Sequence, residues 1–250
     1  EMVGLVRKSQ TTKDAEAYDA KTAQMESGVA RMNEEGYDPI IISRNKEDLI
    51  SKADNIGCEY HTCDILDSDQ IENVSKKYND EVVGLAYCVG SINLKPLRMS
   101  KNDDFIDSFK INTLGAINVI KSNLPSLTKN NGSILLFSTV AVQQGFTNHS
   151  IVSSSKGAIE GLTLSLAAEF APKIRVNCIA PSLTDSKMSQ KMISNETIRK
   201  AIENMHPIPK IGEGEDFGDL SSFLLSRKNS WITGQIFHID GGRSTLRLKG

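Results

Sequence analysis

Short apolar runs separated by longer amphipathic stretches constrain the fold of this chain more than any other feature. The runs are continuous rather than alternating, which is typical of strands buried on both faces; they span residues 39–43, 82–90, 132–140, 174–181 and 235–240, with a weaker candidate at 59–65. Helix-like segments lie between them, at 46–54, 68–79, 101–128, 152–171, 187–203 and 215–227, with Asp67 and Ser100 as candidate N-caps. This alternation predicts an α/β fold, a doubly wound parallel sheet with helices on both faces.

Composition and length narrow the classes of protein that fit. No repeat, low-complexity segment or linker divides the 250 residues, so we expect residues 1–250 to form a single domain. A net charge of −2 without a basic block argues against nucleic acid and anionic membranes as main partners. The longest apolar runs are too short for a transmembrane segment.

The four cysteines form no C-x-x-C pair and share no ligand spacing with the four histidines. We therefore expect thiols rather than a metal site, in a reducing compartment, either the cytoplasm or the interior of an organelle. The chain begins with Glu1, which is compatible with removal of a targeting segment.

Ligands of doubly wound sheets bind at the carboxyl ends of the strands, and the motifs at those ends are specific. They read GYDPIIISRNKEDL, CDILD, INTLGA, RVNCIAPSLTDSKM and SWITGQIFHIDGG. Through these motifs the chain, from about residue 36 onward, resembles the short-chain dehydrogenase/reductase family, especially its 3-oxoacyl-carrier-protein reductase-like members. The resemblance implies a Rossmann-like fold and, for the family, NAD(P)-dependent oxidoreductase activity.

The resemblance also implies a set of site residues. Asn112, Ser138 and Lys156 would belong to the catalytic group, and Val152 occupies the position of the family's tyrosine. The positions implied for cofactor binding are Ser43, Arg44, Asp64, Gly90, Lys156, Pro181 and Thr184. An arginine at the end of the second strand offers charge to a 2′-phosphate, so any dinucleotide bound is expected to be NADP. The alternative interpretation of Arg44 is a solvated loop residue.

The chain departs from the family first at the phosphate-binding loop. Residues 17–24 read AYDAKTAQ and hold no glycine, whereas the family's T-G-x-x-x-G-x-G lets the backbone approach the pyrophosphate. Residues 1–26 are therefore an atypical N-terminal segment. One hypothesis makes residues 2–6 the first strand, with phosphates held by side chains of the following loop: Arg7, Lys8, Ser9, Thr11 and Thr12. The favoured hypothesis is that the pyrophosphate site is gone.

The second departure is at the proton donor. In the family mechanism a tyrosine gives a proton to the carbonyl oxygen, and the lysine one helical turn later lowers its pKa. Val152 has no proton to give, and all five tyrosines precede residue 90. Ser138 lies fourteen residues before position 152, whereas Thr139 has the commoner spacing of thirteen. His149 is a candidate acid, although a partly exposed loop position is the favoured interpretation.

With the tyrosine missing, the three remaining catalytic positions have structural interpretations that are equally good: a strand-ending serine, a helix-kinking asparagine and a carbonyl-capping lysine.

Small and apolar residues spread around 101–128 and 152–171 predict a homo- or hetero-oligomer through these helices, or a subunit of a larger complex. Residues 185–210 are expected to form a lid over a pocket.

Two functions follow from these observations. The favoured one is a non-catalytic scaffold or assembly subunit with degraded cofactor and catalytic sites. The alternative is an atypical NADP-dependent carbonyl or 3-oxoacyl reductase that uses a proton donor other than tyrosine.

Overall fold

The computed structural model describes residues 2–8, 24–186 and 189–247. Its strands form one sheet in the order β3-β2-β1-β4-β5-β6-β7. The strands are β1 (Val3–Lys8), β2 (Tyr37–Ser43), β3 (Glu59–Thr62), β4 (Val82–Tyr87), β5 (Ser133–Phe137), β6 (Arg175–Pro181) and β7 (Ile236–Ile239). Each predicted strand is present within a few residues of its expected position.

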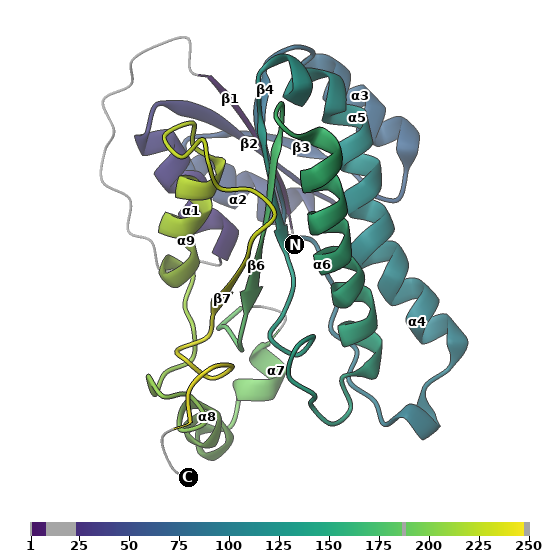
Figure 1. The fold of residues 1–250 in the computed structure, drawn as a ribbon, viewed down its shortest axis with the longest axis vertical. Helices are drawn as coiled ribbons and strands as arrows, with labels where there is room; N and C mark the ends of the chain where they lie inside the picture. Colours follow the sequence, from purple (N-terminus) through teal and green to yellow (C-terminus); the bar gives the residue numbers. More distant parts are fainter. Residues whose placement is uncertain (1, 9–23, 187–188, 248–250) are drawn as a thin grey trace.

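Helices cover both faces of this sheet (Figure 1). They are α1 (Gln24–Glu34), α2 (Lys46–Ile56), α3 (Ser68–Lys77), α4 (Asn102–Phe109), α5 (Gly115–Lys129), α6 (Ser150–Phe170), α7 (Gln190–Ile193), α8 (Glu196–Glu203) and α9 (Glu215–Leu225). Helices α1, α2 and α9 pack on one face, and α3, α5 and α6 pack on the other, with α4 against α6. The predicted α/β, doubly wound fold is confirmed. Among the described residues, no helix combines the length and apolarity needed to cross a bilayer.

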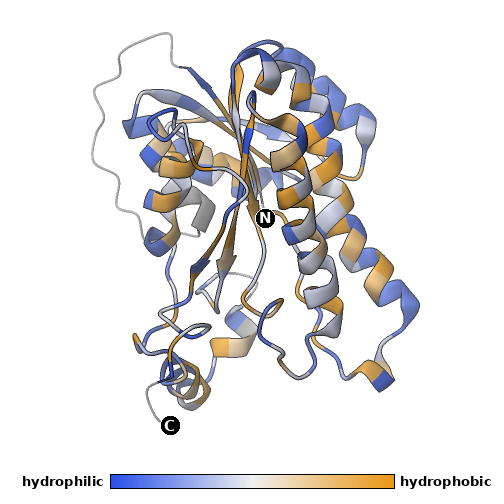
Figure 2. Ribbon diagram, viewed as in Figure 1, coloured by the Kyte–Doolittle hydropathy of each residue, from blue (hydrophilic) through white to orange (hydrophobic). Residues whose placement is uncertain are grey.

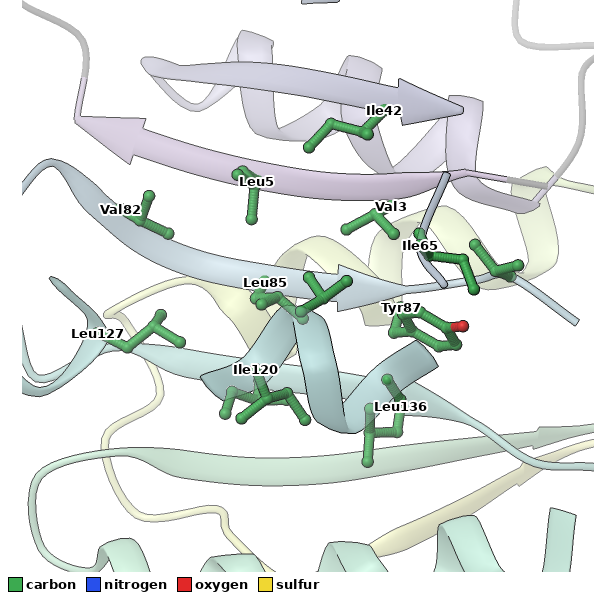
Figure 3. Packing of buried hydrophobic residues seen from close by; sticks show 14 of the residues in the cluster. Val3, Leu5, Ile42, Ile65, Val82, Leu85, Tyr87, Ile120, Leu127 and Leu136 are labelled. Atoms are coloured by element: carbon green, nitrogen blue, oxygen red, sulfur yellow. The ribbon is translucent and has the colours of Figure 1, made fainter. Parts of the chain in front are cut away.

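Side-chain alternation along the strands divides the core into two clusters. On β1, Val3 and Leu5 pack toward α3 and α5, whereas Val6 packs toward α1 and α9. Figure 2 shows apolar colour on the central strands and on parts of the helices, and Figure 3 shows Val3, Tyr87 and Leu136 side by side across β1, β4 and β5. Each such fully buried side chain stabilises the fold by about 1.5–3 kcal/mol.

Strand β1 runs antiparallel to both of its neighbours, while the other strands pair in parallel. Val3 is paired with Ile42 at one end of the strand and Arg7 with Asp38 at the other. In Figure 3 the arrow of β1 points opposite to those of β2 and β4. The carboxyl end of β1 therefore lies at the amino edge of the parallel strands, away from the edge where doubly wound sheets bind ligands.

The helix predicted over 101–128 is interrupted by a π-helical turn, η2 (Lys110–Leu114), between α4 and α5. Tyr87, at the end of β4, donates a 2.6 Å hydrogen bond from its hydroxyl to the carbonyl oxygen of Ile111 in this turn. A Cβ at Gly115 would clash with that hydroxyl, so the glycine allows the helix to approach β4.

The two N-cap predictions have different outcomes. Asp67 caps α3 as predicted, accepting from the backbone amides of Asp69 and Gln70. Ser100 does not cap α4; Lys101 is the N-cap residue, and the Asp104 carboxylate accepts from its amide at 2.9 Å. A short 3₁₀ turn, η1 (Leu97–Met99), precedes this helix.

Candidate functional site

A cavity of about 850 Å³ opens at the carboxyl edge of the parallel strands. Its walls come from α6 and from the residues that follow β2, β4, β5 and β6. Among the described residues, four cationic side chains line it, those of Arg44, Lys52, Lys156 and Arg243, against one carboxylate, that of Asp48. Asp48 Oδ2 lies 3.6 Å from Lys52 Nζ. The cavity is therefore suited to anionic ligands.

One end of the cavity is formed by the residues that end β2. Ser43 and Arg44 line the cavity, and the Arg44 side chain is exposed. Within the described part of the chain no ion pair involves Arg44. Asn45 fixes the start of α2, because its side-chain oxygen accepts from the Asp48 amide at 3.1 Å. Arg44 is thus held at the mouth of the cavity with donors available to a ligand.

Asp64 has a different position from the other residues implied for cofactor binding. Its neighbours Cys63 and Ile65 line the cavity, whereas Asp64 itself is not part of the lining. Its carboxylate accepts a 2.9 Å hydrogen bond from the amide of Leu66, within its own turn. The structure therefore gives this carboxylate a local role in shaping the loop after β3.

Gly90, Asn112 and Lys156 lie next to one another; Gly90 and Lys156 line the cavity, and Asn112 is buried behind them. A Cβ added to Gly90 would lie 2.8 Å from Asn112 Oδ1 and 3.3 Å from Lys156 Nζ. Asn112 is held by its own helix, because its Nδ2 donates to the carbonyl oxygen of Ser108 at 2.9 Å. Lys156 Nζ donates to the carbonyl oxygen of Phe137 at 2.8 Å. The fold thus brings together three of the residues implied by the sequence.

Ser138 and Thr139, the two candidate hydroxyls at the end of β5, have different surroundings. Ser138 is 5% exposed, and its hydroxyl donates to Glu160 Oε1 at 2.7 Å. Thr139 is half-buried, and its Oγ1 accepts from the Ala141 amide at 3.3 Å. Both residues line the cavity. The buried hydrogen bond of Ser138 stabilises the contact between β5 and α6, which leaves Thr139 as the more accessible hydroxyl.

Val152 lies one turn before Lys156 on α6 and lines the cavity, with 4% of its surface exposed. His149, at the N-cap position of the same helix, is half-buried and also lines the cavity. Its Nδ1 lies 2.7 Å from the carbonyl oxygen of Thr147. Because a carbonyl oxygen only accepts, Nδ1 carries a proton, and Nε2 would donate only from a charged ring.

The opposite end of the cavity follows β6. Pro181 and Thr184 line it, and Thr184 Oγ1 donates to the carbonyl oxygen of Ser182 at 3.1 Å. Thr184 also forms a β-bridge with Gly212, so the two ends of the segment between these residues lie next to each other. Within that excursion Met192 and Ile202 line the cavity.

The side-chain phosphate hypothesis for the N-terminal segment is wrong for Arg7. This residue lies at the amino edge of the sheet, paired with Asp38, Glu59 and Glu81 at 3.8, 3.4 and 3.4 Å. The strand reversal takes Lys8 to the same edge, whereas Met2, at the other end of β1, lines the cavity. Ser9, Thr11 and Thr12, and the glycine-free stretch up to residue 23, lie outside the described residues.

The sequence did not single out Arg243, Phe146 or His206, which lie at the β6 end of the cavity. The guanidinium carbon of Arg243 lies 4.7 Å from the centre of the Phe146 ring. His206 is buried, with its Nε2 2.8 Å from the Ser182 hydroxyl. The one available signal was the arginine directly after Gly241 and Gly242 at the end of the last strand.

The fold and the position of the cavity together define an α/β protein with a Rossmann-like, doubly wound sheet. A family model described as enoyl-(acyl carrier protein) reductase matches residues 26–244. The chain belongs to the short-chain dehydrogenase/reductase family, as its strand-end motifs indicate.

Curated relatives and solved structures agree with this assignment. Carbonyl reductase family member 4 of Danio rerio is 29% identical over 218 residues, covering 84% of this chain and 89% of the relative. The 3-oxoacyl-[acyl-carrier-protein] reductase of Bos taurus is 29% identical over 222 residues, 86% of this chain and 91% of the relative. ElxO with NADP bound has the same fold, with a TM-score of 0.82 and 24% identity over 92% of this chain and 97% of ElxO.

Proposed function

We propose that this protein is a non-catalytic member of its family, an assembly subunit that keeps the reductase fold and cavity without hydride transfer. The observation that carries the proposal is Val152. It lies on the cavity wall one helical turn from Lys156, where the family has its tyrosine, and its side chain has no proton to donate. The described chain holds no tyrosine in the cavity lining that could take its place.

The reversed β1 supports the same proposal. In a doubly wound nucleotide-binding sheet the first strand runs to the carboxyl edge and leads into the phosphate-binding turn. Here β1 runs the other way, and Met2, the residue before the strand, lines the cavity. An apolar thioether cannot donate hydrogen bonds to a pyrophosphate, so the cavity fits the two ends of NADP better than its middle.

Helices α4, α5 and α6 are the proposed assembly surface. Leu164 on α6 is 53% exposed, and Ile106 and Phe109 on α4 are also exposed. The Cβ position of Gly161, one turn before Leu164, has no neighbour within 4 Å. An outer face that combines small residues with exposed apolar ones favours close packing against another chain, either a second copy or a related subunit.

We assign residues 185–210 as a lid over the cavity. The bridge between Thr184 and Gly212 holds its two ends together, with the Asp185 amide donating to the Gly212 carbonyl at 2.8 Å. Helices α7 and α8 both lie within it. Its C-terminal part is also tied to the cavity wall, because the Ile208 amide donates to the Gly241 carbonyl at 2.9 Å and His206 Nε2 lies 2.8 Å from the Ser182 hydroxyl. Opening of the lid would break these contacts.

The second candidate is an atypical NADP-dependent reductase, which Arg44 and His149 favour. Arg44 would donate to the 2′-phosphate of NADP, while Lys156 and Thr184 would meet its nicotinamide end. A charged His149 would replace the tyrosine as acid. The ElxO structures show that NADP fits a fold of this kind, and a tyrosine-to-phenylalanine variant of ElxO has NADPH bound.

A titration of the purified protein with NADPH, followed by nicotinamide fluorescence, separates these two functions. The assembly-subunit proposal expects weak binding, since the sequence before Gly28 contains one glycine, Gly4, and therefore lacks the family's glycine-rich motif. Tight, saturable binding that Arg44→Gln weakens, with NADH binding unchanged, would instead favour the reductase. Lys46→Gln, which removes a neighbouring exposed charge outside the cavity lining, is the matched control.

A further inference from the structure

Arg243 places a positive charge in the cavity wall at the end opposite Arg44. It follows Gly241 and Gly242, whose φ angles of 60° and 85° make a tight left-handed turn after β7. The turn is tied to the wall because Gln144 Nε2 donates to the Arg243 carbonyl oxygen at 3.2 Å. The side chain is half-buried and lines the cavity.

The contacts of the Arg243 guanidinium are with neutral groups. Nη1 lies 3.4 Å from the Ser182 hydroxyl, and Nη2 lies 3.5 Å from the Met205 sulfur. The guanidinium carbon lies over the Phe146 ring, 4.7 Å from its centre. Both hydrogen-bond contacts are long, and a thioether is a weak acceptor. Much of the donor capacity of the guanidinium is therefore left for another partner.

Asp240, the acidic residue three positions before Arg243, does not neutralise this charge by direct contact. Asp240 accepts from the amides of Gly242 and Ser244, both at 2.8 Å, and from the Ser244 hydroxyl. In the described part of the chain no ion pair links it to Arg243. Burial lowers the pKa of Arg243, and the charge of Asp240 opposes this effect, but an arginine remains charged at neutral pH.

The surroundings of Arg243 identify the kind of ligand that would use the charge. Phe146, Met192 and Ile202 line the same cavity, so a ligand there meets an apolar wall as well as the guanidinium. A carboxylate matches the planar donor fork of arginine, and a short alkyl chain matches the apolar wall. Arg44, which is proposed to meet a nucleotide phosphate, follows a different strand, β2.

We propose that Arg243 forms a recognition site for small organic carboxylates with an apolar body, at the end of the cavity lined by Phe146 and Ser182. This inference goes beyond the proposed function, because it requires neither bound NADP nor hydride transfer. In an assembly subunit the site would hold a regulatory ligand, and in a reductase it would select the substrate.

The test compares hexanoate with hexanamide, which has similar size but no charge, by ligand-observed NMR titration of the full chain. We expect hexanoate to bind at least about tenfold more tightly, since a charge-assisted hydrogen bond is lost in the amide. Arg243→Gln should abolish this preference, Arg243→Lys should keep part of it, and Arg44→Gln, in the same cavity, should leave it intact.

Equal affinity for the two ligands, no binding of either, or a preference that survives Arg243→Gln would overturn the proposal. So would a preference that disappears in Arg44→Gln, because the carboxylate would then bind at the nucleotide end. If Arg243→Gln does not fold, as judged by its melting curve, the wild-type comparison and Arg243→Lys remain decisive. NADPH titration of the same samples tests the proposed function separately, so either idea can fail alone.

Discussion

Ser138 and Glu160 form a buried hydrogen bond that joins the end of β5 to the middle of α6. The Ser138 hydroxyl donates to Glu160 Oε1 at 2.7 Å, and both residues are buried. The other acceptor near this hydroxyl, the carbonyl oxygen of Lys156, is at 3.4 Å. The contact is a structural use of a serine for which the family resemblance implied catalysis.

Removing the acceptor should destabilise the protein. Glu160→Ala leaves the Ser138 hydroxyl buried without a good partner, so we expect the free energy of unfolding to fall by about 1–3 kcal/mol. Urea denaturation measures this difference. Glu169→Ala makes the same change at an exposed position of α6 and should alter stability by less than about 0.5 kcal/mol. Equal effects of the two substitutions would show that the Ser138–Glu160 contact contributes nothing.

The direction of β1 can be tested by a disulfide. Arg7 and Asp38 are paired across antiparallel strands, and directly opposite residues have Cα atoms within bridging distance. Arg7→Cys with Asp38→Cys should therefore form a disulfide under mild oxidation, detected by peptide mass spectrometry. Ser43 lies five residues further along β2, about 17 Å away, so Arg7→Cys with Ser43→Cys should stay reduced. A parallel β1 would reverse these two results.

Asp104 predicts a specific sensitivity to acid. The hydrogen bond from the Lys101 amide, with a further one from Lys95, lowers the pKa of Asp104 to about 2. In the unfolded chain the pKa of this carboxyl is about 3.9, so the ionised Asp104 side chain stabilises the folded protein above about pH 3.9. This stabilisation is lost as the pH falls toward 2. Asp104→Asn should therefore flatten the decline of unfolding free energy between about pH 4 and pH 2.

The control for this measurement is Asp103→Asn, which removes the same charge from the same helical turn without changing the Lys95 contact. Guanidinium chloride unfolding at several pH values gives the slopes. If the two variants and the wild type lose stability in parallel as the pH falls, the hydrogen bonds of Asp104 are not the cause.

The assembly surface predicts a change of oligomeric state. Leu164→Arg places a charge on the outer face of α6, which would be desolvated in an interface, so light scattering with size-exclusion chromatography should show dissociation of the oligomer. Ile198→Arg on α8 starts from a similar exposure, 50% against 53%, and should leave the mass unchanged. A wild-type protein that is already monomeric would contradict the proposed interface.

Much of the fold follows from the sequence, because continuous apolar runs such as residues 39–43 specify buried strands wherever they occur. The direction of β1 does not follow. A short run such as Val3–Lys8 presents alternate side chains to both faces in either direction, and the choice depends on distant partners such as Glu59 and Glu81. The break in the helix at Asn112 agrees with the interpretation of this residue as a helix-kinking asparagine, but its π-helical geometry did not follow from the apolar pattern.

The sequence predicted the site residues that lie at strand ends, but it could not predict the direction of their side chains. The positions of Gly90, Asn112 and Lys156 converge as the family resemblance implied. Sequence spacing cannot show that Ser138 points to Glu160, or that Arg243 returns from the last strand to the cavity, because both depend on tertiary packing.

Hydride transfer is the most direct test of the central claim. The wild-type chain and Val152→Tyr would be incubated with a 3-oxoacyl thioester and NADPH deuterated at the transferred position, and deuterium in the hydroxyacyl product measured by mass spectrometry. We predict no stereospecific transfer by the wild type, and none by Val152→Tyr, since a tyrosine alone does not restore the pyrophosphate site. Stereospecific deuterium transfer by the wild-type chain would contradict the account and identify the protein as a working reductase.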